Sequence, residues 1–276
     1  MIAHYLAPII IGIIISVSFV ALFMKSGLIN SLPPSLGGAL YDQVFWTLSI
    51  TLIGLFGVTF LYWLIKRKKD FELRVLIALA VAPTVAILVI ILSQTVLMIL
   101  AKTITSLMAS IVVLISLYVS IFSVIFILSN AFSTKIRNLI FIIYGSLLGS
   151  FISLLLPTIS LVTMLISVAI YDLIMLNSGW FNEIIKVLSQ TRTAGPRMSY
   201  FSEEVEIGLG ELIFYSFIPA HVEAYYGLEL LTITLIMTGI GVLLNLWILD
   251  KKGFIAGLPA PIFLGLSPLI TMFLLN

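Results

Sequence analysis

Two acidic residues lie within apolar stretches of the sequence, and they are the residues best suited to chemistry. Asp172 lies in Ser-Val-Ala-Ile-Tyr-Asp-Leu, and Glu211 lies in Ile-Gly-Leu-Gly-Glu-Leu-Ile. An ionisable group within a membrane span costs roughly 2.5–3.5 kcal/mol on insertion scales, so it is a functional-site hypothesis by default. Two carboxyl groups at contact distance share a proton, so one can act as a base on water while the other polarises a carbonyl. Such a pair is one way to hydrolyse a peptide bond without a metal.

The composition predicts an all-α membrane protein that crosses the bilayer several times. Hydrophobic residues make up 61% of the chain and charged residues 9%, and apolar runs of about 18 residues or more recur. Cysteine is absent, which excludes disulfides and thiolate nucleophiles. The two histidines, His4 and His221, stand far apart and form no zinc motif. We therefore expect no metal, no cofactor and, at a net charge of +2, no nucleic-acid partner.

Nine spans are predicted, and together they form one integral membrane domain. They cover residues 5–24, 43–65, 71–92, 105–128, 138–156, 158–176, 207–226, 228–248 and 254–275. Spans one to five occupy 1–156, and spans six to nine, with a cytoplasmic loop at 177–206, occupy 157–276. The third run continues apolar to Leu100, so a longer helix or a kink near Pro83 stays open. A count of eight also stays open, because only Pro157 separates spans five and six; nine is favoured because about 39 residues are too long for one crossing.

Lysine and arginine predict the orientation in the cell membrane. Twelve of the fourteen lie in the even-numbered connections and adjoining span ends, and only Lys25 and Lys102 lie on the other side. The twelve are Lys66, Arg67, Lys68, Lys69, Arg74, Lys135, Arg137, Lys186, Arg192, Arg197, Lys251 and Lys252. Because basic residues stay in the cytoplasm, we expect a cytoplasmic N-terminus and an external C-terminus. The first span lacks a basic segment before it and is expected to be retained rather than cleaved as a signal peptide.

One connection is long. Trp180, Phe181, Ile184, Ile185 and Leu188 recur at helical spacing and predict a short interfacial helix after Asn177. The stretch with Gly195-Pro196 and Glu203-Glu204 predicts a mobile loop. Whether this connection is a simple tether or a gating lid stays open. No internal repeat is visible, so an inverted-repeat transporter receives no support.

Three unusual features share one depth in the predicted membrane. Asp172 lies four residues before the end of span six and Glu211 four residues after the start of span seven, so both carboxyls lie about 6 Å inside the cytoplasmic boundary. Each acid alone has a structural alternative, since a carboxyl this near the interface can reach water and one near a helix N-terminus is stabilised by the dipole. The third feature, Leu258-Pro259-Ala260-Pro261, is expected to be extended, because proline donates no backbone hydrogen bond and disfavours helix.

The glycines beside Glu211 favour close approach of another backbone. Gly208 and Gly210 carry no side chains, which leaves room for a neighbouring helix or a bound peptide. His221 is expected as a polar interface residue at the outer end of span seven. Glu223 and Glu229 flank the following turn and are expected to be solvated.

These motifs resemble the signatures of the presenilin and signal peptide peptidase family. The resemblance rests on Tyr171-Asp172 in span six, on Gly208-Leu209-Gly210-Glu211 in span seven and on Pro259-Ala260-Pro261 in span nine. The family signatures read Tyr-Asp, Gly-x-Gly-Asp and Pro-Ala-Leu. The sequence Ala-Gly-Leu-Pro ending at Pro259, and His221 ten residues after Glu211, are most similar to the archaeal members. The order and spacing match over roughly the last 120 residues.

The resemblance implies an intramembrane aspartyl protease with nine spans, acting on transmembrane helices of other proteins. Asp172 and Glu211 would be catalytic, and the residues of the three motifs together with Leu258 would bind or support substrate. The segment around Leu258–Pro261 would receive an unwound substrate as an added strand. The orientation matches presenilin, which implies substrates with external N-termini. Membrane lipid is an expected partner, and self-association stays open.

The chain departs from the family pattern at two positions. Glu211 stands where the family carries its second aspartate, and Pro261 stands where it carries leucine. The extra methylene displaces the carboxyl by on the order of 1.5 Å, and a misplacement of about 1 Å can cost 100-fold in rate. Two alternatives therefore remain: an inactive helix-binding scaffold of the same family, and a proton- or cation-coupled transporter that uses the acids as a relay.

Overall fold

The computed structural model describes residues 2–28, 45, 49, 52, 70–129, 133–177, 199–201, 206–252 and 257–275. Within them lie eight helices and one two-stranded sheet, so the predicted all-α class is confirmed. The helices are α1 (Ile2–Lys25), α3 (Asp70–Ala101), α4 (Ser106–Leu128), α5 (Thr134–Leu155), α6 (Thr158–Asn177), α8 (Leu209–Tyr226), α9 (Leu228–Lys252) and α10 (Pro259–Leu275). The strands β1 (Ser199–Phe201) and β2 (Glu206–Gly208) pair antiparallel.

The helices have the length and apolar character of membrane spans. Within the described residues, five are long and apolar enough to cross a bilayer, and they belong to α1, α3, α4, α5 and α9. Shorter apolar stretches lie on α6 and α10. The chain is therefore an α-helical membrane protein. The predicted span 43–65 lies almost wholly outside the described residues, so the count of nine stays a prediction.

Two proline positions have opposite effects on the helices. Pro157 separates α5 from α6, and Leu156 before it has extended backbone angles, as a residue preceding proline prefers. The alternative that merged spans five and six is therefore wrong. By contrast, α3 continues through Pro83 to Ala101, which makes it longer than the predicted 71–92. In an apolar environment an unpaired backbone group is costly, so the helix persists on both sides of the proline.

Small residues on α5 allow it to pack closely against α1 and α8. Gly145, Ser146, Gly149, Ser150 and Ser153 recur at four-residue spacing and are all buried. A Cβ added at Gly149 would lie 3.0 Å from the Ser216 Cβ of α8. Membrane helices associate through such small residues, because lipid provides no hydrophobic driving force between them.

A second packing centre joins α6, α8, α9 and α10. Leu161, Leu165 and Ala169 recur every four residues along α6, and all three are fully buried. They pack with a cluster from the other three helices: Phe217, Ile218, Val222, Leu231, Ile262, Leu266 and Leu269. Because the α6 side of this cluster ends at Ala169, one turn before Asp172, the core holds that acid at the edge of the packed region.

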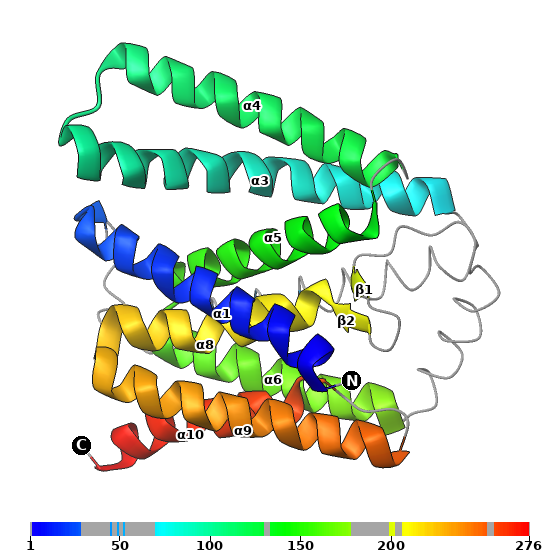
Figure 1. The fold of residues 1–276 in the computed structure, drawn as a ribbon. Coiled ribbons are helices and arrows are strands. Elements are labelled where there is room, and N and C mark those ends of the chain that lie inside the picture. The colour runs from blue at the N-terminus through cyan, green and yellow to red at the C-terminus, as the bar shows by residue number, and fades with distance from the viewer. Residues whose placement is uncertain are drawn as a thin grey trace.

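From α3 to α10, successive helices of the described structure alternate in direction (Figure 1). The hairpin β1–β2, the ends of α6 and α9, and the starts of α8 and α10 gather at one end of the molecule. The α3–α4 pair lies at the periphery, and in this view α5 and α1 lie between it and the remaining helices. The two chain termini lie at opposite ends of the bundle. One end of the bundle thus gathers the elements that carry the predicted site.

Candidate functional site

Asp172 lies near the end of α6 and is bound to the chain segment that precedes α10. Its side chain is half-buried, and the backbone N–H of Leu258 donates a hydrogen bond of 3.1 Å to its Oδ2. A carboxylate that accepts a backbone N–H is held in one orientation by a charge-assisted bond. The end of α6 and the start of α10, 86 residues apart in sequence, therefore meet at Asp172.

Glu211 lies in the first turn of α8 and contacts the same segment. Gly257 leaves space for its carboxyl, since a Cβ added at Gly257 would lie 2.6 Å from Glu211 Cδ and 3.1 Å from Oε2. The carboxyl groups of Asp172 and Glu211 are also close enough for their charges to interact. The structure thus places both acids around the Gly257–Leu258 peptide group.

Two polar side chains hold this peptide group from the opposite side. The Gly257 carbonyl accepts a 2.7 Å hydrogen bond from the Tyr215 hydroxyl and a further bond from the Asn245 amide. Tyr215 is in turn hydrogen-bonded to Tyr5 of α1. We call Tyr215, Asn245 and the Gly257–Leu258 peptide group the peptide clamp. The N–H of this peptide group faces Asp172, and its carbonyl faces α8 and α9. The clamp therefore connects α8 and α9, through the segment before α10, to Asp172 of α6.

The sequence reasoning missed Tyr215, Asn245 and Tyr5. Tyr215 lies four residues after Glu211, which places both on one side of α8. Asn245 is a buried amide within a predicted span, and that combination is itself a signal for a function. Tyr5 is distant in sequence and carried no comparable signal.

The glycine motif lies at the start of α8 with open space beside it. Gly208 ends β2 and caps the helix, and Gly210 is exposed; a Cβ added at either would meet no atom within 4 Å. No neighbouring helix of the described structure therefore occupies the space that these glycines leave. Leu209 is buried in a cluster with Phe141 and Phe126, away from the two acids.

Tyr171 precedes Asp172 and is half-buried. Successive helical positions point about 100° apart, so the two side chains leave α6 on different sides. The described contacts assign Tyr171 no bond to either acid.

The expected extended segment at Leu258–Pro261 is wrong for its last three residues. α10 begins at Pro259, and the first helical hydrogen bond runs from the Ile262 N–H to the Leu258 carbonyl at 3.1 Å. The first N–H groups of a helix have no partner within it, so prolines at 259 and 261 lose nothing there. Pro259, Ala260 and Pro261 therefore form the first turn of α10. Pro261 lies against Gly241 of α9, where an added Cβ would come within 2.7 Å of its nitrogen.

Part of the expected mobile loop is ordered as a hairpin. Ser199, Tyr200 and Phe201 pair with Gly208, Ile207 and Glu206 in antiparallel register. The predicted span 207–226 consequently starts as a strand, and α8 begins two residues later. The expected interfacial helix after Asn177, with Gly195-Pro196 and Glu203-Glu204, lies outside the described residues.

Two expectations at the other end of α8 are wrong. His221 is fully buried, with Nε2 bonded to Thr158 at 2.9 Å and Nδ1 to the Ser153 carbonyl at 2.9 Å. It therefore joins α8 to the α5–α6 connection instead of facing the interface. Glu223 is 6% exposed and buried, whereas Glu229 is exposed as expected. The packing of α8 against its neighbours buries residues that a helix at the membrane rim would expose.

Comparison of the sequence with protein-family models and with curated proteins finds no match. The described residues hold no group of three or more metal-ligating side chains. Chemically, the arrangement brings two carboxyl groups to one peptide group of the chain, close enough for their charges to interact.

Proposed function

We propose that this chain is an intramembrane aspartyl-type endopeptidase, similar to presenilin and signal peptide peptidase, that hydrolyses peptide bonds in transmembrane helices. The observation that carries this proposal is the meeting of Asp172 and Glu211 at the Gly257–Leu258 peptide group. Placing two acids from separate helices within a membrane bundle costs free energy, so their convergence supports a function for them. Their proximity supports a dyad that shares one proton.

The proposed reaction is a general acid–base hydrolysis. The ionised carboxyl takes a proton from water while the oxygen of that water forms a bond to the substrate carbonyl carbon. The protonated carboxyl donates its proton to the carbonyl oxygen. The tetrahedral intermediate then collapses: the C–N bond breaks, the leaving nitrogen receives a proton from one carboxyl of the dyad, and a hydroxyl of the intermediate returns its proton to the other carboxylate. The two roles belong to the coupled pair, so neither acid is assigned as the base.

The peptide clamp would position Asp172 during this reaction. Tyr215 and Asn245 donate to the Gly257 carbonyl and so restrain the peptide plane whose N–H holds Asp172. Donors fixed before the reaction need no rearrangement as charge develops, which is how enzymes stabilise transition states. We therefore assign Tyr215 and Asn245 as positioning residues, since they act through the peptide group.

Substrate backbone needs an extended partner, and the start of α10 offers none. The hairpin β1–β2 is the extended backbone closest along the chain to Glu211, because β2 ends at Gly208. We infer that an unwound substrate segment pairs with this hairpin by strand addition. The open space beside Gly208 and Gly210 supports this placement.

We further propose the nine-span topology with a cytoplasmic N-terminus. α1 and α3 run in the same direction in Figure 1, as the first and third spans of this topology must. The start of α5 and the end of α9, which contain Lys135 and Lys251, lie at the bundle end where α6 ends and α8 begins. The ends of α1 and α3, where Lys25 and Lys102 stand, lie at the other end. The positive-inside rule then puts the dyad near the cytoplasmic side.

Cleavage of a reporter transmembrane peptide by the purified full-length protein tests the proposed activity. We expect cleavage that is abolished by Asp172→Ala and by Glu211→Gln, and retained or raised by Glu211→Asp. The gain with aspartate could reach on the order of 100-fold, since a carboxyl displaced by about 1 Å can cost that much. Mass spectrometry of the products locates the cleaved bond.

The other outcomes separate the two alternatives. Reporter binding without cleavage, in both the unsubstituted protein and the Glu211→Asp variant, would show a helix-binding scaffold and overturn the protease. Proton or cation flux into vesicles that depends on Asp172, with no cleavage, would instead indicate a transporter.

A further inference from the structure

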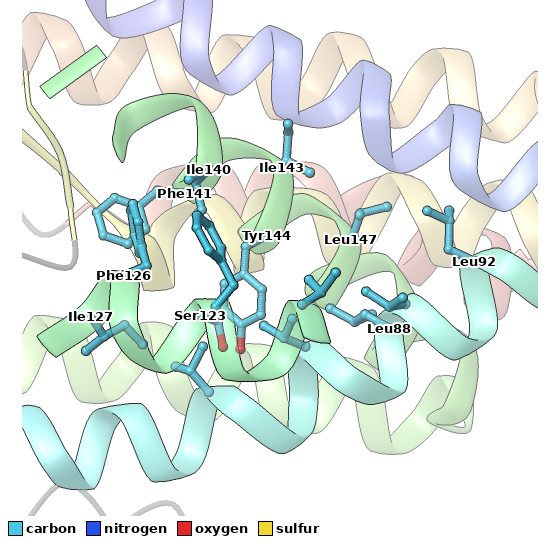
Figure 2. Close-up of a pocket in the computed structure, with 15 residues that line it drawn as sticks. Leu88, Leu92, Ser123, Phe126, Ile127, Ile140, Phe141, Ile143, Tyr144 and Leu147 are labelled. Carbon is cyan, nitrogen blue, oxygen red and sulfur yellow. The ribbon is translucent and has the colours of Figure 1, made fainter. Parts of the chain in front are cut away.

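An apolar cavity lies between α5 and the α3–α4 pair, away from the two acids (Figure 2). Its volume is about 260 Å³. The residues that line it are Val81, Val85, Leu88, Val89 and Leu92 of α3, Val119, Phe122, Ser123, Phe126 and Ile127 of α4, and Ile140, Phe141, Ile143, Tyr144 and Leu147 of α5. We call it the α3–α5 cavity.

The cavity exists because α3 contacts the rest of the bundle mainly at two separate places. α3 and α4 pack along each other, whereas α3 touches the rest of the bundle mainly in two places. One is the cluster that contains Ala78, and the other is where Ile91 and Leu92 pack beside Leu154. Between them the Thr84 and Tyr144 hydroxyls form a 2.6 Å hydrogen bond. The cavity is thus bounded by packed contacts and is part of the helix arrangement.

The lining offers nothing to a polar ligand. Ser123 donates its hydroxyl to the Ser120 carbonyl at 2.7 Å, and the Tyr144 hydroxyl is paired with Thr84. A polar or charged molecule would lose its water and gain no partner here, which is unfavourable. Water itself needs two to four polar partners, and an apolar cavity of about 150 Å³ already stays dry and binds benzene. The occupant must be apolar.

The shape of the cavity and its surroundings identify the apolar molecule. The lining on α3 extends from Val81 to Leu92, a distance of roughly 16 Å along the helix axis. The three helices that line it each contain a stretch long and apolar enough to span the bilayer. Phe122 and Ile143 line the cavity and are also 44% and 39% exposed, so it opens toward the lipid between α4 and α5. A space that is long, apolar and open to the bilayer fits a hydrocarbon chain.

We propose that the α3–α5 cavity binds one acyl chain of a membrane lipid. The chain would lie alongside α3 and fill the gap between α5 and the α3–α4 pair. An empty gap would forfeit the dispersion contacts of its lining, whereas a bound chain restores them. A transmembrane helix is excluded as the occupant, because its diameter of about 10 Å or more exceeds what this volume can hold.

Photocrosslinking in vesicles tests this proposal without any assumption about catalysis. The full-length protein is reconstituted in phosphatidylcholine that includes a small fraction carrying a diazirine in the middle of one acyl chain. After irradiation, mass spectrometry maps the adducts. We expect adducts on cavity residues such as Leu88 and Leu147, saturating at one lipid per protein. Adducts confined to the exposed faces, for example at Leu114 and Ile121, would overturn the proposal.

A matched pair of variants on α3 adds a second criterion. Val85→Phe places extra volume inside the cavity, while Ile87→Phe adds a ring on the same helix at a residue that is 47% exposed. We expect Val85→Phe to lower the cavity adducts about tenfold or more, since excluding two methylenes has that effect. Ile87→Phe should leave them unchanged. Equal cavity labelling in both variants would contradict the proposal, and if Val85→Phe does not fold, Val119→Phe from α4 serves the same purpose.

Discussion

At the scale of single residues, one glycine determines how the two acids meet. Gly257 has no side chain, and the Glu211 carboxyl occupies the position that a Cβ would take. Glutamate reaches farther than aspartate by one methylene, and the missing side chain at 257 provides room for that reach. Glutamate at 211, where the similar presenilin motif reads aspartate, thus has a steric counterpart on the opposite segment.

The peptide clamp yields a prediction with a built-in control. Tyr215→Phe removes the 2.7 Å bond to the Gly257 carbonyl, and Tyr225→Phe removes a 2.7 Å bond to the Leu154 carbonyl at the far end of α8. Loss of one such bond costs about 0.5–1.5 kcal/mol, and the Gly257 carbonyl keeps its bond from Asn245. We expect Tyr215→Phe to lower the kcat for reporter cleavage about tenfold at unchanged KM, because the proposed role of the clamp is to position Asp172.

Tyr225→Phe should lower the free energy of unfolding by the cost of one hydrogen bond and leave kcat unchanged. If both variants lower kcat equally, the clamp has only a structural role. A larger change in KM than in kcat would mean that Tyr215 contacts substrate directly.

At the scale of the elements, close helix packing depends on glycines that lie where two helices cross. Gly149 of α5 lies where a Cβ would come within 3.0 Å of Ser216 and 3.2 Å of the Ile213 carbonyl carbon. Gly239 of α9 has no atom within 4 Å of that position. The same residue type is therefore required in one helix and dispensable in another.

Alanine substitutions distinguish these two glycines. Gly149→Ala should destabilise the protein by about 1–3 kcal/mol, because α5 and α8 must move apart. Gly239→Ala should be neutral or stabilising by up to about 1 kcal/mol, since alanine is the better helix former. Thermal unfolding in detergent measures both. A loss of stability in Gly149→Ala no larger than that in Gly239→Ala would contradict the described α5–α8 contact.

At the scale of the whole molecule, the two ends of the bundle differ in character. One end holds the acids, the peptide clamp and the hairpin. The other holds a buried polar group of His221, Thr158 and Tyr226, whose hydrogen bonds join α8 to the start of α6. The proposed topology puts the first end near the cytoplasm and the second near the outside.

The absence of cysteine allows this topology to be tested directly. Single cysteines introduced by Lys102→Cys and Lys135→Cys occupy exposed positions next to α3 and at the start of α5. We expect a membrane-impermeant maleimide to label residue 102 in intact cells and residue 135 only after permeabilisation. The reverse pattern would invert the orientation, and labelling of both in intact cells would remove the predicted span between them.

The sequence by itself determined the all-α class, the break at Pro157 and most helix boundaries, because run length and proline position are properties of the chain alone. It also predicted that the two acids, the glycines beside Glu211 and the prolines at 259 and 261 belong to one site. Only the tertiary structure brought Tyr215 and Asn245 to the Gly257–Leu258 peptide group and Tyr5 to Tyr215, since the packing of α1, α8 and α9 creates those contacts. It also buried His221 and Glu223, and it turned Pro259–Pro261 into a helix start. Burial depends on which neighbouring helices cover a residue. A proline ends a helix or begins one according to whether the residues before it are helical, and the tertiary structure decides that.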